Sequence, residues 1–349
     1  MKNSFTKIAT IFTLVLANAF YAQNIITVDN NVNSSANFTS LQAAINSAQP
    51  NDFIYISPSE TSYEGGTTSK KLHFRGIGHT PEVTAGISAN IGAISLISSG
   101  TPAASAAGSS ISGLQIASIS MFQGTALQVN NVTIENNLIN QISATNADNW
   151  VVRGNIITSR IITDINSNNW LIVNNFFNVL GASLDPLNGL SVDTTVSNNI
   201  FVTTGNQPSF TVFTNCFNVA NNNIFISQNA ATTGIGISNA ILSNNLSFNA
   251  AGTTMAALLG TGNFNNVNPS FTTITPANNF TFSLANNYNV SNASLVGVDG
   301  TPIGIFGFNF PFNKRGYPFS MPYIESMNIL NQTIPLNGTL QVDVTAKSN

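Results

Sequence analysis

The chain has very little charge. Charged residues make up only 7% of its 349 residues, whereas hydrophobic residues make up 43%. A typical globular protein is about one quarter charged, so Asn, Ser and Thr must supply most of the polar surface here. The net charge is -3 and no basic stripe occurs, which sets nucleic acid aside as a partner. Low charge suits stacked coils, in which like charges would lie directly above one another.

Cysteine and histidine are almost absent. Cys216 is the single cysteine, so no intramolecular disulfide can form. We interpret it as a small buried residue on a strand. His73 and His79 lie in the least regular part of the sequence, where we expect solvated loop residues. No Asp-Asp pair occurs.

The first 22 residues have the pattern of a secretory signal. Lys2 and Lys7 accompany a short apolar run at 8–16, and small residues offer cleavage after Ala19 or Ala22. The run is too short to span a bilayer, and no later apolar run reaches that length. We therefore predict no membrane span and an exported mature protein, either periplasmic or extracellular.

The central region contains the same three-residue pattern six times: a polar residue or glycine, an asparagine, then an apolar residue. The asparagine recurs after 18, 20, 24, 24 and 22 residues, and a period near 20 marks a solenoid. One apolar column lies three residues before the asparagine, as an inward-facing position requires, and another lies one residue after it. We predict that the asparagine turns the chain and that its copies stack as a ladder, comprising Asn137, Asn155, Asn175, Asn199, Asn223 and Asn245.

The sequence around this array predicts its ends. A strand at 25–28, a short amphipathic helix at 38–48 with Thr39 or Ser40 as N-cap, and a strand at 53–56 form an entry cap. Residues 265–267 are read as a seventh copy of the repeat, and 278–310 as a closing cap. This gives a signal peptide at 1–22, a solenoid at 23–310, and a β-rich tail at 311–349. The tail either folds back along the solenoid or forms the stub of a small β-module.

Three features together resemble the pectin-lyase-like superfamily, in particular its exported Gram-negative members. They are the entry helix with its following strand, the asparagine column, and the exit signature Asp299-Gly300-Thr301-Pro302-Ile303-Gly304-Ile305, and they span about residues 25–310. The resemblance implies an all-β fold: a single-stranded right-handed parallel β-helix with an N-terminal capping helix and a short C-terminal β tail.

The resemblance also implies relatives that cleave polysaccharides. Hydrolysis needs two carboxylates a few ångströms apart, and elimination in such relatives needs a basic residue beside acidic residues that hold calcium. Asp164 and Asp185 lie 9 and 10 residues after their ladder asparagines, and Arg160 is near in sequence. These three residues are candidates for an acid/base pair or a calcium site. The alternative is that both aspartates are solvated turn residues.

Two further pairs share a column on adjacent coils. Glu135 and Arg153 are predicted to form a surface ion pair worth less than about 1 kcal/mol. Trp150 and Trp170 are predicted to stack, either as a sugar-binding platform or as a buried corner stack.

The sequence thus favours an exported, non-catalytic β-helix that binds polysaccharide or another cell-envelope surface, without metal or cofactor. The alternatives are a divergent polysaccharide lyase or glycoside hydrolase, with calcium as its ion, and a purely structural envelope component.

Overall fold

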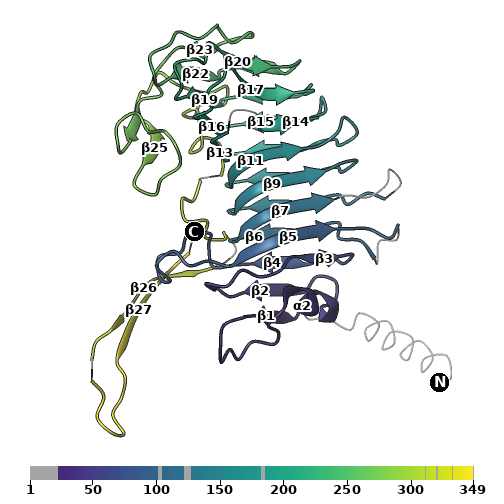
Figure 1. Cartoon of the computed structure of the whole chain (residues 1–349), viewed down its shortest axis with the longest axis vertical. Coiled ribbons are helices and arrows are strands. Elements are labelled where there is room, and N and C mark those ends of the chain that lie inside the picture. The colour runs from purple at the N-terminus through teal and green to yellow at the C-terminus, as the bar shows by residue number, and fades with distance from the viewer. Residues whose placement is uncertain are drawn as a thin grey trace, which may run out of the picture.

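The protein is an elongated stack of parallel coils with the N-terminal coils at the bottom of Figure 1. The computed structural model describes residues 23–100, 104–121, 127–181, 185–310, 312–319, 321–331 and 333–348. The predicted signal sequence, residues 1–22, lies outside the described residues.

A 10-stranded sheet of short parallel strands forms one face of the stack. Each coil adds one strand, and most of these strands are three residues long because the chain turns at once into the next sheet. In order along the stack, the strands are β1 (Ile25–Val28), β2 (Phe53–Ile56), β4 (His73–Arg75), β6 (Ser110–Ser112), β8 (Thr133–Glu135), β10 (Val151–Arg153), β12 (Leu171–Val173), β15 (Thr195–Ser197), β18 (Val219–Asn221) and β21 (Ile241–Ser243).

A 13-stranded sheet forms the second face and divides after β11, which pairs with both β13 and β14. Its strands are β3 (Gly66–Thr68), β5 (Asn90–Leu96), β7 (Gln115–Met121), β9 (Leu138–Ala144), β11 (Ile156–Ile162), β13 (Phe176–Val179), β16 (Ile200–Thr203), β19 (Ile224–Ser227), β22 (Leu246–Asn249) and β23 (Phe264–Asn265), with the branch β14 (Leu187–Asn188), β17 (Ser209–Thr214) and β20 (Gly234–Ile237).

Both sheets are parallel and in register from coil to coil. Val152, for example, has Ile134 as its partner on one side and Ile172 on the other. The connections wind in the right-handed sense expected for parallel crossovers (Figure 1). The predicted right-handed parallel β-helix is therefore confirmed.

The predicted entry helix is present as α2 (Leu41–Ser47). Ser40 is its N-cap, with the side chain accepting a hydrogen bond from the Ala43 amide. At the other end Lys70 Nζ donates to the carbonyl oxygens of Ile45, Asn46 and Ala48, which satisfies carbonyls that the short helix leaves open. Leu41 and Ile45 are buried at the first coils, so the helix protects the core where the stack begins.

The ladder asparagines lie inside the turn between the two sheets and are fully buried. Each Nδ2 donates to Oδ1 of the next ladder residue at 2.9 to 3.1 Å, and the same oxygen accepts the preceding ladder residue's backbone N–H. The ladder continues to Asn263, whose Oδ1 accepts the Asn245 amide at 2.9 Å. The seventh copy expected at 265–267 instead lies at 262–264, so that prediction is wrong by three residues.

The residue that turns the chain is the one before the ladder asparagine, and the prediction on this point was wrong. Positive φ angles of 51° to 64° occur at this preceding position, where Asn and Gly tolerate left-handed backbone best. The ladder residue itself is left free to direct its amide along the stack. The turning residues are Asn136, Gly154, Asn174, Asn198, Asn222 and Asn244.

The two apolar columns beside the ladder face opposite ways. The column three residues before it lies in the interior core with the aromatic stack of Phe177 and Phe201, whose ring centroids are 4.4 Å apart. The column one residue after it faces outward and belongs to a second core. Its buried members are Ile156, Phe176, Ile200, Ile224 and Leu246.

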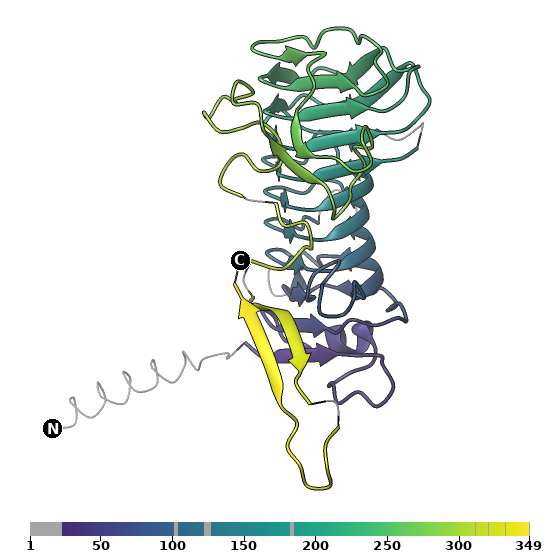
Figure 2. The ribbon, with the colours of Figure 1, turned by 90° about the vertical axis from the view of Figure 1, so that its left-hand side faces the viewer.

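The second core exists because the chain doubles back along the outside of the β-helix (Figure 2). After a small antiparallel sheet of β24 (Phe271–Thr273) and β25 (Asn287–Val290), the chain returns toward the N-terminal coils as a strap, which we define as residues 295–319. The buried partners that residues 280–312 contribute are Phe280, Tyr288, Leu295, Ile303, Ile305 and Phe312. Residues 278–310 therefore cover the side of the β-helix rather than its end, which corrects the predicted closing cap.

The turning asparagines hold the strap. Asn174 Nδ2 donates to the carbonyl oxygens of Ile305 and Gly307, at 2.9 and 2.7 Å. Asn244 Nδ2 reaches the carbonyl of Val296. In the repeats that contain two asparagines, the two residues thus have separate roles: the second binds the neighbouring coil, and the first binds the strap at Asn174 and Asn244.

The strap also covers the predicted ion pair. Arg153 bonds Glu135 Oε2 through Nε and Nη2 at 2.8 and 2.6 Å, and only 8% of the Glu135 side chain is exposed. The Phe310 ring lies over the guanidinium with its centroid 3.5 Å away. The pair forms as predicted, but it is partly buried under the C-terminal segment instead of lying on the open surface.

The chain ends in an antiparallel hairpin of β26 (Tyr323–Ile329) and β27 (Val342–Lys347), which projects beside the first coils (Figures 1 and 2). Both suggestions for the tail are thus realised, by a segment that folds back and by a small β-module.

Candidate functional site

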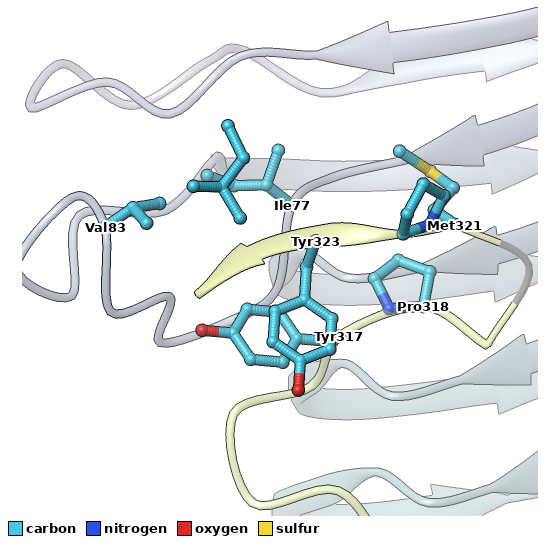
Figure 3. Close-up of a pocket in the computed structure, with 8 residues that line it drawn as sticks. Ile77, Val83, Tyr317, Pro318, Met321 and Tyr323 are labelled. Atoms are coloured by element: carbon cyan, nitrogen blue, oxygen red, sulfur yellow. The ribbon is translucent and has the colours of Figure 1, made fainter. Parts of the chain in front are cut away.

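A concave surface lies where the strap and the hairpin meet the loop that follows β4. Two adjoining cavities occur there and share Tyr317 and Tyr323. Figure 3 shows the apolar cavity, with Ile77 and Val83 on one side and the two tyrosines on the other. We call the two cavities together the tyrosine cleft.

The loop and the strap are joined by a dense set of polar contacts. The backbone of Thr80 donates to the Arg315 carbonyl at 3.1 Å, and Arg315 Nη1 donates back to the Thr80 carbonyl at 3.2 Å. The amide of Glu82 donates to the Tyr317 hydroxyl at 3.1 Å. Asn136, the turning residue of its coil, donates to the Tyr317 carbonyl. Residues more than 230 positions apart in sequence therefore form one rigid wall.

Tyr317 and Tyr323 stack closely, with centroids 3.9 Å apart and planes at 9°. Tyr317 is buried and Tyr323 is half-buried, so part of the outer ring remains accessible from the cleft. The apolar cavity beside them is about 200 Å³, and Pro318, Met321, Pro322 and Ile324 complete its lining. A supported aromatic ring beside an apolar wall fits the C–H face of a sugar ring.

The second cavity, about 340 Å³, carries the charged groups of the cleft, Glu82, Lys314, Arg315 and Glu325. Glu82 pairs with Arg315 at 3.3 Å, and Glu325 pairs with Lys347. Each of these two carboxylates thus has a cationic partner. Lys314 Nζ donates to the carbonyl oxygens of Leu284 and Asn286, both at 2.9 Å, and burial lowers its pKa, helped by nearby Arg315.

His79 lies under the strap beside the cleft, and the expectation that it is a solvated loop residue was wrong. Its side chain is fully buried, and burial lowers its pKa to about 3. Nδ1 bonds the Thr80 hydroxyl at 2.9 Å, whereas Nε2 has no hydrogen-bond partner. Gly316, at φ 72°, passes so closely that an added Cβ would lie 2.1 Å from His79 Cδ2. His73 is also structured, as the first residue of β4.

The structure does not bring the candidate acidic pair together. In the register of β11 with β14, Ile161 is the partner of Leu187 and Ile162 is the partner of Asn188. Asp185 therefore lies two residues before this paired stretch and Asp164 two residues after it, at opposite ends. Asp164 instead accepts hydrogen bonds from the Asn146 amide and the Ser167 hydroxyl, which lower its pKa against the effect of burial. Within the described chain no ion pair links Arg160 to either aspartate.

The two tryptophans stack as expected but cannot form a sugar-binding platform. Their centroids are 4.9 Å apart with planes at 12°, and their exposed fractions are 0% and 1%. Trp150 Nε1 donates to the Val129 carbonyl and Trp170 Nε1 to the Ala147 carbonyl. Interior packing therefore satisfies both the ring faces and the indole N–H groups.

Cys216 is buried two residues after β17 rather than on a strand. Burial raises its pKa to about 11. A thiol in this state is a poor nucleophile.

Among the described residues, no cluster of three or more His, Cys, Asp or Glu side chains could hold a metal ion. The same part of the chain contains no helix with the length and apolar character needed to cross a bilayer.

The residues of the tyrosine cleft were not predicted as a site. The sequence feature that could have indicated this site is Lys314-Arg315-Gly316-Tyr317. It places two charged residues and an aromatic ring together in a chain that is only 7% charged. Its opposing wall could not be found from spacing, because the loop at Ile77 to Val83 belongs to an early coil.

No protein-family profile and no curated protein matches the chain. Among solved structures, it is similar to the pectin methylesterase from Aspergillus niger, with 12% identity and a TM-score of 0.34 over 76% of this chain and 91% of that one. Because the TM-score is this low, the fold assignment depends on the strand pairing within the chain. That register identifies the chain as a right-handed parallel β-helix, the fold that its sequence resemblance implies.

Proposed function

We propose that the protein is an exported, non-catalytic β-helix that binds a polysaccharide or another cell-envelope polymer in the tyrosine cleft. The observation that carries this proposal is the stacked pair Tyr317 and Tyr323, which supports an accessible aromatic ring between an apolar and a charged cavity. Such a combination fits carbohydrate, which offers C–H faces for stacking and hydroxyls for hydrogen bonds.

The fixed wall of the cleft supports binding. Hydrogen bonds between the strap and the loop at Thr80 and Glu82 hold this wall in place, so it loses little conformational entropy when a ligand is held. Export rests on the sequence pattern of residues 1–22. Cell fractionation with N-terminal sequencing tests it, since cleavage after Ala19 or Ala22 is expected.

Binding is tested with the mature protein on a glycan array, followed by calorimetric titration of the best ligand. Tyr323→Ala removes the accessible ring and should weaken binding by about 10-fold, equivalent to roughly 1.4 kcal/mol. Tyr323→Phe keeps the ring and should retain most of the affinity. Tyr55→Ala is the matched control, because Tyr55 is a partly exposed aromatic residue on β2, outside the cleft.

The absence of any retained glycan would contradict the proposal, as would equal effects of Tyr323→Ala and Tyr55→Ala. The alternative, a divergent lyase or hydrolase, has one observation in its favour, the two carboxylates Glu82 and Glu325 lining one cavity. Assays for new reducing ends and unsaturated products test it. Activity that Glu82→Gln, Glu325→Gln, Asp164→Ala or Asp185→Ala abolishes would replace the binding proposal with an enzyme.

A further inference from the structure

The C-terminal hairpin has two faces of opposite character. A register shift between Ile324 and Ser326 is a bulge, which lets Ile324 and Met327 share a face although they are three residues apart. Each residue on that face has an apolar partner across the hairpin. The apolar face consists of Ile324, Met327, Ile329, Val342, Val344 and Ala346.

The other face is polar. Asn328 pairs with Asp343, and Tyr323 pairs with Lys347, which also forms an ion pair with Glu325. This face therefore needs no cover in water. By contrast, the five larger side chains of the apolar face are 41% to 59% exposed, and the hairpin stands away from the coils (Figure 1). An isolated two-stranded sheet with a bare apolar face is marginally stable at best.

A lipid surface does not suit this hairpin. Within the described residues, β26 and β27 pair only with each other, so each strand keeps an open edge of backbone N–H and C=O groups. Open edges are not tolerated in the hydrocarbon region of a bilayer. We therefore expect protein, rather than lipid, to cover the apolar face of the hairpin.

We propose that the apolar face is the dimerisation surface of the protein, packed against the same face of a second copy about a two-fold axis. The face bears no charge, so two copies meet without like-charge repulsion. Face-to-face packing of two small sheets is a standard arrangement. A two-fold contact also requires a self-complementary patch, which a uniformly apolar face provides.

The exposed area is of the size that a dimer needs. Nine larger apolar side chains are 41% to 94% exposed: the five of the apolar face, and Leu330, Ile334, Leu336 and Leu340 of the connecting loop, which supply about half of the exposed area and must join the contact. At roughly 60 to 120 Å² for each fully exposed side chain, they present roughly 300 to 600 Å². A standard interface buries about 800 Å² per partner, about 65% of it apolar in homodimers, or about 500 Å².

Dimerisation would place two tyrosine clefts on one assembly, since Tyr323 begins the strand that carries the interface. On a polymer with repeated binding units, two linked sites increase the apparent affinity without any new contact. This consequence rests on the proposed function, whereas dimerisation itself does not depend on a ligand.

Sedimentation equilibrium of the mature protein without ligand tests the proposal over a micromolar to millimolar series. We expect a monomer–dimer equilibrium in which Met327→Lys or Val344→Lys weakens association by about 100-fold or more, because the two-fold axis brings the new charges together. Asn328→Lys is the matched control, since it adds the same charge to the polar face of the same strand, and it should leave the dissociation constant unchanged.

A wild-type protein that stays monomeric throughout the series would overturn the proposal. So would equal effects of Met327→Lys and Asn328→Lys, or wild-type protein that co-floats with phosphatidylcholine vesicles as a monomer. Failure of glycan binding with dimerisation intact would refute only the proposed function.

Discussion

Replacing one rung of the asparagine ladder should destabilise the whole stack, and Asn175→Leu is the sharpest case. Asn175 Nδ2 donates to the carbonyls of Val152 and Val173 and to Asn199 Oδ1, at 2.8 to 3.0 Å. Its Oδ1 accepts both the backbone N–H and Nδ2 of Asn155, each at 3.0 Å. All five of these contacts are lost in the variant, although leucine is close to asparagine in size.

The expected cost is large because the site is fully buried. Because the Asn175 Nδ2 group has two hydrogens for its three acceptors, the five contacts amount to about four hydrogen bonds. At a net 0.5 to 1.5 kcal/mol each they give roughly 2 to 6 kcal/mol, which includes the Asn155 groups left buried without this acceptor. Asn140→Leu is the control, since Asn140 is an exposed residue of β9, and its replacement should change stability by less than about 0.5 kcal/mol.

Urea unfolding followed by circular dichroism measures both variants. The ladder variant should unfold at a much lower urea concentration than the control. Loss of structure in one coil removes the packing surface of the adjacent coils, so the effect should spread along the stack. If Asn175→Leu unfolds at the same urea concentration as Asn140→Leu, the reasoning about buried amides in this stack is refuted.

Three further results are expected. The His79 pKa is about 3 in the folded protein, against an ordinary value of 6.5. At pH values between these two, the unfolded protein therefore binds one more proton than the folded protein. Acid therefore favours unfolding, and between pH 7 and pH 4 the wild-type protein should lose about 3 kcal/mol more stability than His79→Gln. Parallel profiles of stability against pH for the two proteins would contradict this. Gly316→Ala should displace the strap and weaken ligand binding, because the added Cβ would meet His79. Gly252→Ala is the control: it is also at positive φ but has nothing within 4 Å, so it should only cost about 1 to 2 kcal/mol in stability. Unchanged binding in Gly316→Ala would be evidence against a cleft shaped by the strap. Cys216 should react with a thiol reagent only after unfolding, because it is buried with a raised pKa, and rapid labelling of native protein would show that this coil is open.

The sequence predicted what depends on the repeat. The period of the asparagines led to the stack, the register and the ladder, because each of these follows from coils of nearly equal length. The roles within each Asn-Asn pair could not be predicted, since both residues tolerate turns and only the backbone shows which one has a positive φ.

The strap and the cleft could not be derived from the sequence for a different reason. The column at Ile156 and Phe176 is as apolar as the interior column, so nothing in its composition shows that it faces outward. Its cover comes from residues over 100 positions away, such as Ile305, whose contact with Asn174 spans 131 residues. A contact of that range leaves no local pattern.

The register of the coils is the claim on which the ladder, the strap and the cleft all depend, and disulfide trapping tests it most directly. Thr195 and Val219 are paired on adjacent strands, about 4.8 Å apart, within the range that a disulfide spans. In a Cys216→Ser background, Thr195→Cys with Val219→Cys should therefore cross-link within one chain on mild oxidation. Thr195→Cys with Ile241→Cys, two coils apart in the same column, should not, since about 10 Å is too far. Failure of the first pair to cross-link, or equal cross-linking of both, would contradict the account.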